Sequence, residues 1–287
     1  MKYGTSGFRD KAENIIQISH KIGVIVSFLV STKNQNYGIM ITASHNLHFD
    51  NGVKIVNYDG EMISKDDEEL IESYINDKVN ISFPPDILSP KIIYIGNDTR
   101  ESGFQIKKKI IEGIQSNSSV IIKDLNYVTT PQHHYLVNKN SDNVNDYINK
   151  FKIISDLDLD LYLNNIVIDC ANGIGFNTLN SLNLNLNLIN TKIDDFDLLN
   201  FKSGSDYVIS DNIPPTNFNS EKIGCSLDGD ADRFIFYYFD INGDFKILDG
   251  DYIGALYMYT IIRQLKFIDN EYSIGYIHSP YTNSALL

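Results

Sequence analysis

The stretch Ile223–Phe239, with the sequence IGCSLDGDADRFIFYYF, joins two apolar runs through a short acidic turn. The runs Ile223–Leu227 and Phe234–Phe239 have the length and composition of strands, so the turn connects strand to strand. Three aspartates alternate along it, separated by a Gly and an Ala: Asp228, Asp230 and Asp232. Converging carboxylates repel one another unless a hard divalent cation neutralises them, and Mg²⁺ prefers oxygen ligands. The stretch therefore predicts two strands with a magnesium site at their turn.

Three other interpretations of this acidic turn compete with the magnesium site. A solvated surface turn is the simplest, but the apolar flanks and the adjacent Arg233 disfavour it. An EF-hand loop needs Gly at its sixth position and Glu at its twelfth, where this chain has Arg233 and Phe239. An aspartate-based phosphatase would use Asp228 as nucleophile and Asp230 as acid, but that class has Thr or Val where Asp232 stands.

On either side of this turn, apolar runs alternate with helical patterns. The other strand-like runs are Tyr37–Ile41, Val53–Val56, Lys91–Ile95, Val120–Ile122, Ile166–Asp169 and Tyr272–Ile277. The helical patterns are Ile15–Val30, Asp66–Ile75, Glu101–Gln115 and Asp251–Lys266. Such alternation is typical of α/β proteins with mostly parallel sheets.

The predicted fold class is α/β, with tandem domains built on mixed or parallel sheets. The polar, Asn-rich tract at 137–149 suggests a boundary, which gives a first domain at 1–142 and a second at 143–255. Residues 256–287 would begin a third domain. The stretch Leu182–Leu188, LNLNLNL, reads literally as a half-buried strand. With 32 Asn in the chain, however, compositional bias explains its alternation at least as well.

The overall charge limits the classes of partner. Among 287 residues, 24 Lys and Arg stand against 37 Asp and Glu, which gives a formal net charge of −13. A general nucleic-acid binder needs a basic face, so this balance argues against one. An anionic substrate would need a local cluster of cations, because the protein as a whole repels it.

The cysteines and the N-terminus bear on the cellular compartment of the protein. Cys170 and Cys225 lie in strand-like surroundings and lack the spacing of a metal site, so two reduced core thiols are expected. No uninterrupted apolar run reaches the roughly 18 residues of a membrane span; the most apolar run, Ile22–Val30, is about half as long. The first residues, MKYGTSGFRD, do not resemble a signal peptide. We therefore expect a soluble, cytoplasmic protein without a membrane partner.

A second motif, TASHN at residues 42–46, directly follows the apolar run that ends at Ile41. Free backbone N–H groups surround a serine at a strand end, so Ser44 could bind phosphate or be phosphorylated. A hydrolase triad is disfavoured, because His45 would point away from Ser44 in an extended chain and no G-x-S-x-G motif is present. A structural turn remains the simplest alternative.

Arginine is scarce, with four residues against 20 Lys, so the positions of the arginines are informative. Arg9, Arg100 and Arg233 each follow a turn or a strand end, where a guanidinium could bind an oxyanion in a bidentate way. Arg263 falls in a helical pattern and is expected at the surface. Lys54 adds a cation where a turn meets a strand.

Taken together, the motifs resemble one family, the α-D-phosphohexomutases. The segments that carry the resemblance are YGTSGFR (3–9), TASHN (42–46), DNGVKIV (50–56) and DGDADR (228–233), in the family's order. Further segments bring the match closest to the family's acetylglucosamine branch. They are TTPQ (129–132) with Tyr135, DCANGIG (169–175), GSDYV (204–208) with Pro214-Pro215, and LDGDYI (248–253).

The resemblance implies an enzyme that moves phosphate between O6 and O1 of N-acetylglucosamine phosphate, towards UDP-N-acetylglucosamine. Ser44 would carry the phosphoryl group and, with the three aspartates, bind Mg²⁺. Arg9 and Arg233 would lie near the transferred group, and Lys54 or His45 would handle the proton of the sugar hydroxyl. A hexose bisphosphate would act as activator. Another phosphohexomutase, acting on glucose or mannose phosphates, or a non-catalytic binding module derived from a mutase, are the alternatives.

Two departures from the family pattern stand out. Leu47 replaces the proline that usually follows S-H-N, which removes a backbone constraint but no chemical group. The family also has four domains, and the resemblance implies that the sugar-recognition loop of the third and the phosphate-binding loop of the fourth lie outside this chain. The isolated chain is therefore expected to turn over poorly, and a second chain that supplies the missing domains is an expected partner.

Overall fold

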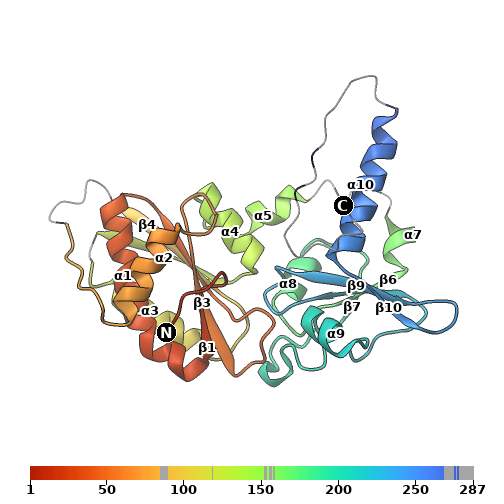
Figure 1. Ribbon diagram of the computed structural model, residues 1–287, viewed down its shortest axis with the longest axis horizontal. Coiled ribbons are helices and arrows are strands. Elements are labelled where there is room, and N and C mark those ends of the chain that lie inside the picture. Colours follow the sequence, from red (N-terminus) through yellow and green to blue (C-terminus); the bar gives the residue numbers. More distant parts are fainter. Residues whose placement is uncertain are drawn as a thin grey trace.

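The computed structural model contains two α/β units, each built on a five-stranded sheet (Figure 1). It describes residues 1–84, 90–117, 119–151, 154, 157, 159–267, 275 and 277. The first unit comprises β1 (Phe8–Lys11), α1 (Ala12–Lys33), β2 (Tyr37–Ile41), β3 (Asp50–Val56), α2 (Lys65–Ile75), β4 (Lys91–Asn97), α3 (Gly103–Ile114), β5 (Val120–Tyr127) and α4 (Thr130–Lys139).

Helix α5 (Asn145–Lys150) follows α4 and packs beside it, with the Tyr147 ring 5.5 Å from that of Tyr135. The remaining elements form or surround the second sheet. They are α7 (Asp160–Leu163), β6 (Ile166–Asp169), α8 (Gly175–Asn180), β7 (Asn187–Ile189), the 3₁₀ turn η1 (Phe196–Leu198), α9 (Ser205–Asp211), β8 (Ile223–Leu227), β9 (Phe234–Phe239), β10 (Phe245–Leu248) and α10 (Gly250–Leu265).

Both sheets are mixed. The first has the order β1-β3-β2-β4-β5, in which β3 pairs antiparallel with β1 and β2, while β4 pairs parallel with β2 and β5. The second has the order β10-β9-β8-β6-β7, in which β9 is antiparallel to both neighbours and β6 is parallel to both of its own. The predicted α/β fold class with mixed or parallel sheets is thus confirmed, and both sheets are mixed. They are not mostly parallel, because each also contains antiparallel strand pairs.

The first sheet is covered on both faces, which explains its uninterrupted apolar strands. Ile39 and Ile93 pack with residues of α1, α2 and α3 on one face. Their strand neighbours Met40 and Tyr94 pack with Leu136 and Val137 of α4 on the other. Successive strand residues face opposite sides, so a strand buried on both faces needs apolar residues throughout.

Helices α1 and α3 cross in very close contact. A Cβ atom on Gly23 would lie 2.1 Å from the carbonyl oxygen of Ile110, and one on Gly113 would lie 2.1 Å from that of His20. Two glycines that face each other therefore allow the backbones to touch, and any side chain at either position would force the helices apart.

Helix α1 is also long and apolar enough to span a membrane by length and hydropathy alone. Its buried residues, among them Ile15, Ile22, Val26 and Leu29, belong to the core of the first unit. Packing inside the protein accounts for its apolar composition.

The second unit has a smaller core. Val208 of α9 and Ile235 and Tyr237 of β9 are buried together, with Phe218 and Phe245 against them. Helix α10 extends away from this sheet (Figure 1) and buries none of its residues. The expectation that Arg263 lies on the surface is confirmed, since this residue is exposed near the end of α10.

Several sequence predictions need correction or fall outside the described residues. The stretch Leu182–Leu188 is not a strand over its length, because β7 begins only at Asn187. The tract at 137–149 includes the end of α4 and most of α5, and the boundary at 255/256 lies within α10. Most of the expected strand Tyr272–Ile277 lies outside the described residues. The three domain ranges themselves stay predictions.

Candidate active site

Ser44 lies in the connection between β2 and β3, at the edge of the first sheet that faces the second unit. It is 5% exposed, and its backbone has φ 52°, in the left-handed region. The Ser44 amide donates to Thr42 Oγ1 at 2.8 Å, and that hydroxyl donates to Asp98 Oδ2 at 2.7 Å. Side chains from two strand ends thus fix the serine backbone in an unusual conformation.

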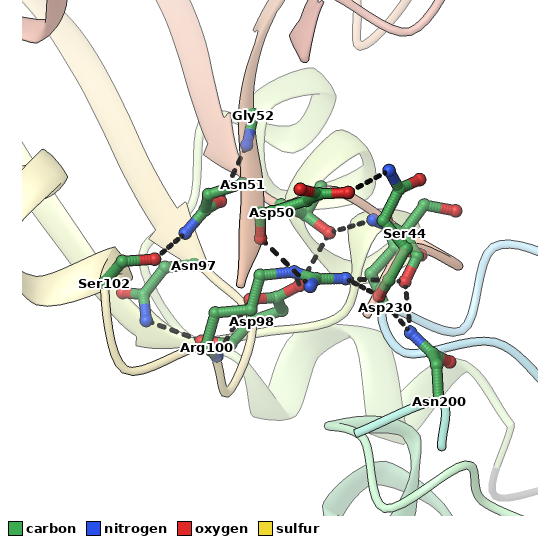
Figure 2. Close-up of polar contacts among 12 residues, drawn as sticks. Ser44, Asp50, Asn51, Gly52, Asn97, Asp98, Arg100, Ser102, Asn200 and Asp230 are labelled. Atoms are coloured by element: carbon green, nitrogen blue, oxygen red, sulfur yellow. Dashed lines mark hydrogen bonds and ion pairs between the residues drawn. The ribbon is translucent and has the colours of Figure 1, made fainter. Parts of the chain in front are cut away.

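Arg100 holds this loop in shape (Figure 2). Its guanidinium, 1% exposed, pairs with Asp98 at 3.0 Å. Its other nitrogens donate to the carbonyl oxygens of Ser44, Asn46, Leu47 and Asp50 at 2.7 to 3.1 Å. The expectation that Arg100 binds an oxyanion is therefore wrong: its donors are all used inside the protein.

The serine meets the acidic turn of the second sheet directly. Ser44 Oγ donates to Asp228 Oδ2 at 2.6 Å, although 184 positions separate the two residues. Arg233 Nε donates to the same Asp228 oxygen at 3.0 Å, and Arg233 Nη2 lies 3.2 Å from Ser44 Oγ. The Ser44 hydroxyl of the first unit therefore lies within hydrogen-bond distance of the Asp228 carboxylate and the Arg233 guanidinium of the second.

The three aspartates of the turn converge as predicted. One carboxylate oxygen of each lies within 4.8 Å of the other two. Burial, followed by repulsion from the neighbouring aspartates, raises the pKa of Asp230 well above its usual value. Burial and the charge of Asp228 raise the pKa of Asp232 to about 6. Without a cation, burial and mutual repulsion make the fully ionised cluster energetically unfavourable.

This donor set fits a hard divalent cation. Asp230 Oδ1 is buried and has no hydrogen-bond partner among the described residues, while Oδ2 accepts from Thr130 Oγ1 at 2.7 Å. A buried carboxylate oxygen left without a partner is rare in proteins unless something else binds it. Oxygen ligands from three carboxylates are the set that Mg²⁺ prefers.

The remaining predicted residues lie around this point. Arg9 Nη1 donates to Asn46 Oδ1 at 3.3 Å, and Arg9 Nε has no partner among the described residues. Burial lowers the pKa of His45, and the nearby Arg233 lowers it further; its Nδ1 also lacks a partner there. The positive charge of Lys54 offsets a small part of the rise that burial and Asp228 cause in the pKa of Asp232.

Gly229 makes the approach of the two loops possible. A Cβ atom at this position would lie 2.8 Å from the carbonyl oxygen of Ser44, and 2.4 Å separates a Cβ on Gly173 from the carbonyl oxygen of Gly229. The glycines of DGDADR and of DCANGIG therefore let three loops stack without side chains between their backbones.

A pocket of about 400 Å³ borders this site. Asp232, Arg233 and Ser205 contribute polar groups to its lining, and Ile209 and Ile253 contribute apolar ones. Asp232 and Arg233 of the site thus form part of the wall of a space lined by both polar and apolar side chains, as is usual for ligand-binding pockets.

Two residues of the site were missed from the sequence. Thr130, at the start of α4, donates to Asp230. Asn200, before α9, donates to the carbonyl oxygens of Ser44 and Asn46, and Figure 2 shows its side chain directed towards Ser44. Thr130 belongs to the quoted segment TTPQ, but no local signal marks Asn200 among the other asparagines.

Comparison with known proteins identifies the family. Residues 15–81 match the model of the phosphoglucomutase/phosphomannomutase alpha/beta/alpha domain I. A crystal structure of an N-acetylglucosamine-phosphate mutase, described as a member of the alpha-D-phosphohexomutase superfamily, is 30% identical with a TM-score of 0.82 and covers 99% of this chain and 68% of its own. The chain therefore belongs to the α-D-phosphohexomutase superfamily, as its motifs indicated.

Other relatives carry the same kind of name. Phosphoacetylglucosamine mutase 1 of Schizosaccharomyces pombe is 32% identical over 99% of this chain, which spans 61% of that protein. An Aspergillus fumigatus N-acetylphosphoglucosamine mutase in complex with GlcNAc-6P and magnesium is 27% identical with a TM-score of 0.79, over 94% of this chain and 56% of its own. The chain thus spans about three-fifths of the length of the curated relatives that it matches.

Proposed function

We propose that this chain carries the phosphoserine and metal-binding parts of a mutase that interconverts the 6-phosphate and 1-phosphate of N-acetylglucosamine. The observation that supports it most directly is the 2.6 Å hydrogen bond from Ser44 Oγ to Asp228, inside a cluster of three aspartates. The names of the relatives favour the acetylglucosamine substrate over glucose or mannose phosphates. A bisphosphate activator is proposed on the same basis, since an Aspergillus fumigatus variant was crystallised with glucose 1,6-bisphosphate.

The first transfer would run from phosphorylated Ser44 to a sugar hydroxyl. The bond between Oγ and phosphorus breaks as the hydroxyl oxygen bonds to phosphorus, and the electron pair returns to Oγ. Arg233 Nη2, 3.2 Å from Oγ, is placed to stabilise the negative charge that develops there. The second transfer is the reverse step, from the other phosphate of the sugar bisphosphate back to Ser44.

The hydroxyl proton needs an acceptor. His45 suits this role, because its lowered pKa favours the neutral imidazole and its Nδ1 has no hydrogen-bond partner among the described residues. Lys54 is the alternative. Arg9 would bind the transferred phosphate through Nε, which has no partner among the described residues.

Mg²⁺ is the proposed cofactor, held by Asp228, Asp230 and Asp232 together with a phosphate oxygen on Ser44. When bound, it would supply positive charge that stabilises the phosphoryl group during transfer. The Aspergillus fumigatus relative crystallised with magnesium supports this assignment.

Two further expectations stay part of the proposal. On the basis of the sequence, we propose a cytoplasmic location and a second chain that supplies the parts of the relatives outside this one.

The proposal is tested by phosphate transfer to the protein. Incubation with glucose 1,6-bisphosphate and Mg²⁺ should add one phosphate by intact-mass measurement, and Ser44→Ala should abolish it. Ser220→Ala, at an exposed serine, is the matched control. A phosphate that survives in Ser44→Ala and is released by hydroxylamine would instead identify an aspartyl phosphate, as in the phosphatase interpretation.

A further inference from the structure

The contacts that join Ser44 to Asp228 cannot persist through the proposed reaction. The 2.6 Å bond uses the Oγ–H donor, which is lost as soon as Ser44 is phosphorylated. The contact from Arg233 to Oγ must likewise change when phosphorus occupies that oxygen. Since the two loops come from different sheets, other contacts must keep them aligned in both states of the serine.

Asn200 makes one such contact from the second unit to the first. Its Nδ2 donates to the carbonyl oxygens of Ser44 and Asn46 at 2.8 and 2.9 Å, and the residue is 7% exposed. Its own position is fixed, because its backbone amide donates to the carbonyl oxygen of Ala171. A Cβ on Gly229 would lie 2.9 Å from Asn200 Nδ2, so the Asn200 side chain lies between the serine loop and the acidic turn.

Thr130 makes the reverse contact, from the first unit to the second. Its hydroxyl donates to Asp230 Oδ2 at 2.7 Å and its backbone amide donates to the Asp230 carbonyl oxygen at 3.0 Å. Both donors are at the start of α4, whose capping box between Thr129 and Gln132 fixes the helix end. The hydroxyl orients the Asp230 carboxylate and leaves Oδ1 for a cation.

Arg100 does not duplicate this role. It binds the same carbonyl oxygens as Asn200, but it comes from the first unit and is paired with Asp98 there. Arg100 therefore fixes the shape of the serine loop, whereas Asn200 fixes the position of that loop against the acidic turn.

We propose that Asn200 and Thr130 form a reciprocal latch, in which each unit positions the reactive loop of the other throughout the phosphorylation cycle. The inference rests on the proposed function for its rate effects. Both are positioning residues: neither contacts the reacting atoms. None of the latch contacts uses Ser44 Oγ, so all of them are compatible with both serine and phosphoserine.

The test separates phosphate transfer from metal binding. Asn200 has φ 56°, so Asn200→Gly removes the amide without backbone strain, and Asn212→Gly, at an exposed asparagine with φ 55°, is the matched control. We expect Asn200→Gly to slow transfer from glucose 1,6-bisphosphate to Ser44 about 10- to 100-fold, with Mg²⁺ affinity and melting temperature close to those of the control. Transfer as fast as in Asn212→Gly would overturn the role of Asn200.

Thr130 is tested in the same assays. Thr130→Val should slow transfer and weaken Mg²⁺ binding about tenfold or more, and Thr130→Ser, which keeps the hydroxyl, should restore both. Equal behaviour of the Val and Ser variants would overturn its role. If wild-type Ser44 takes up no phosphate, the proposed function fails. In that case the latch is tested by hydrogen exchange of the backbone amides in the loop that contains Ser44 and Asn46. Exchange there should be faster in Asn200→Gly than in the wild type, and unchanged in Asn212→Gly.

Discussion

In the first sheet the connection between the antiparallel strands β2 and β3 carries Ser44, and in the second the connection between β8 and β9 carries the aspartates. In both sheets, the neighbouring parallel strand ends at or just before a buried aspartate. Asp98 follows β4 and accepts from Thr42 at 2.7 Å, while Asp169 ends β6 and accepts from Ser226 at 2.7 Å. The two units thus have the same arrangement of strands around the site, but one carries a serine there and the other carries three aspartates.

The buried aspartates differ in what neutralises them. Asp98 pairs with the fully buried Arg100, which in turn binds four carbonyl oxygens of the serine loop. Asp169 accepts only from neutral groups in the described part of the chain: Ser226 Oγ, Asn190 Nδ2 and the amides of Ala171 and Gly204. The long serine loop thus depends on a buried charge pair, whereas Asp169, beside the short acidic turn, is held by neutral donors.

Removing Arg100 should give the largest effect. Arg100→Gln would leave the Asp98 carboxylate buried without its cation and several carbonyl oxygens without donors. We expect a loss of about 3–5 kcal/mol in the free energy of unfolding, measured by denaturant titration, against little change in the exposed control Arg263→Gln. A loss below about 1 kcal/mol would mean that Arg100 does not hold the loop.

The corresponding change in the second sheet should cost less. Asp169→Asn replaces one accepting oxygen by an NH₂ group that faces donors, so we expect a loss of about 1–3 kcal/mol by the same method. Asp211→Asn, at an exposed helix end, is the control. A loss equal to that of Arg100→Gln would contradict the difference drawn between the two sheets.

The smallest effect concerns pH. Because the pKa of Asp232 is raised to about 6, the folded, metal-free protein holds a proton that the unfolded chain has released. The resulting stabilisation is present at low pH and is lost as pH rises through about 6. Mg²⁺ must displace this proton and any proton held by Asp230, whose pKa is also raised. Its affinity should therefore fall at least about tenfold per pH unit below 6, or about 1.4 kcal/mol.

Titration calorimetry at pH 5, 6 and 7 checks this dependence. Asp244→Asn, in the turn between β9 and β10, should leave the pH dependence of Mg²⁺ affinity unchanged. A Mg²⁺ affinity in the wild-type protein that does not vary between pH 5 and 7 would show that no ligand of the metal site titrates near 6.

The sequence predicted the strands whose burial is visible in their own composition. Tyr37–Ile41 and Phe234–Phe239 match β2 and β9 because apolar side chains fill them. The edge strands β1 and β10, FRDK and FKIL, were missed, since they are short and exist only through pairing with β3 and β9. Helix α4 was also missed, although its Thr129–Gln132 capping box with proline in the first turn is a readable start signal.

The same distinction holds for the site. Ser44 and the three aspartates were found because a hydroxyl at a strand end and alternating carboxylates have chemical meaning by themselves. Arg100 was found but given the wrong role, since burial decides whether a guanidinium faces a ligand or the protein. Asn200 acts only through carbonyl oxygens more than 150 positions away, and no local pattern encodes such a contact.

The left-handed backbone of Ser44 restricts which residues suit this position. Glycine would adopt φ 52° freely, whereas a residue with a side chain loses about 1 kcal/mol or more there. Ser44→Gly would relieve that backbone cost, but it would also remove the buried 2.6 Å hydrogen bond to Asp228 and the oxygen that could carry a phosphoryl group. The strained backbone and the hydroxyl thus come together at this position, because the one residue that adopts this conformation freely has no oxygen to phosphorylate.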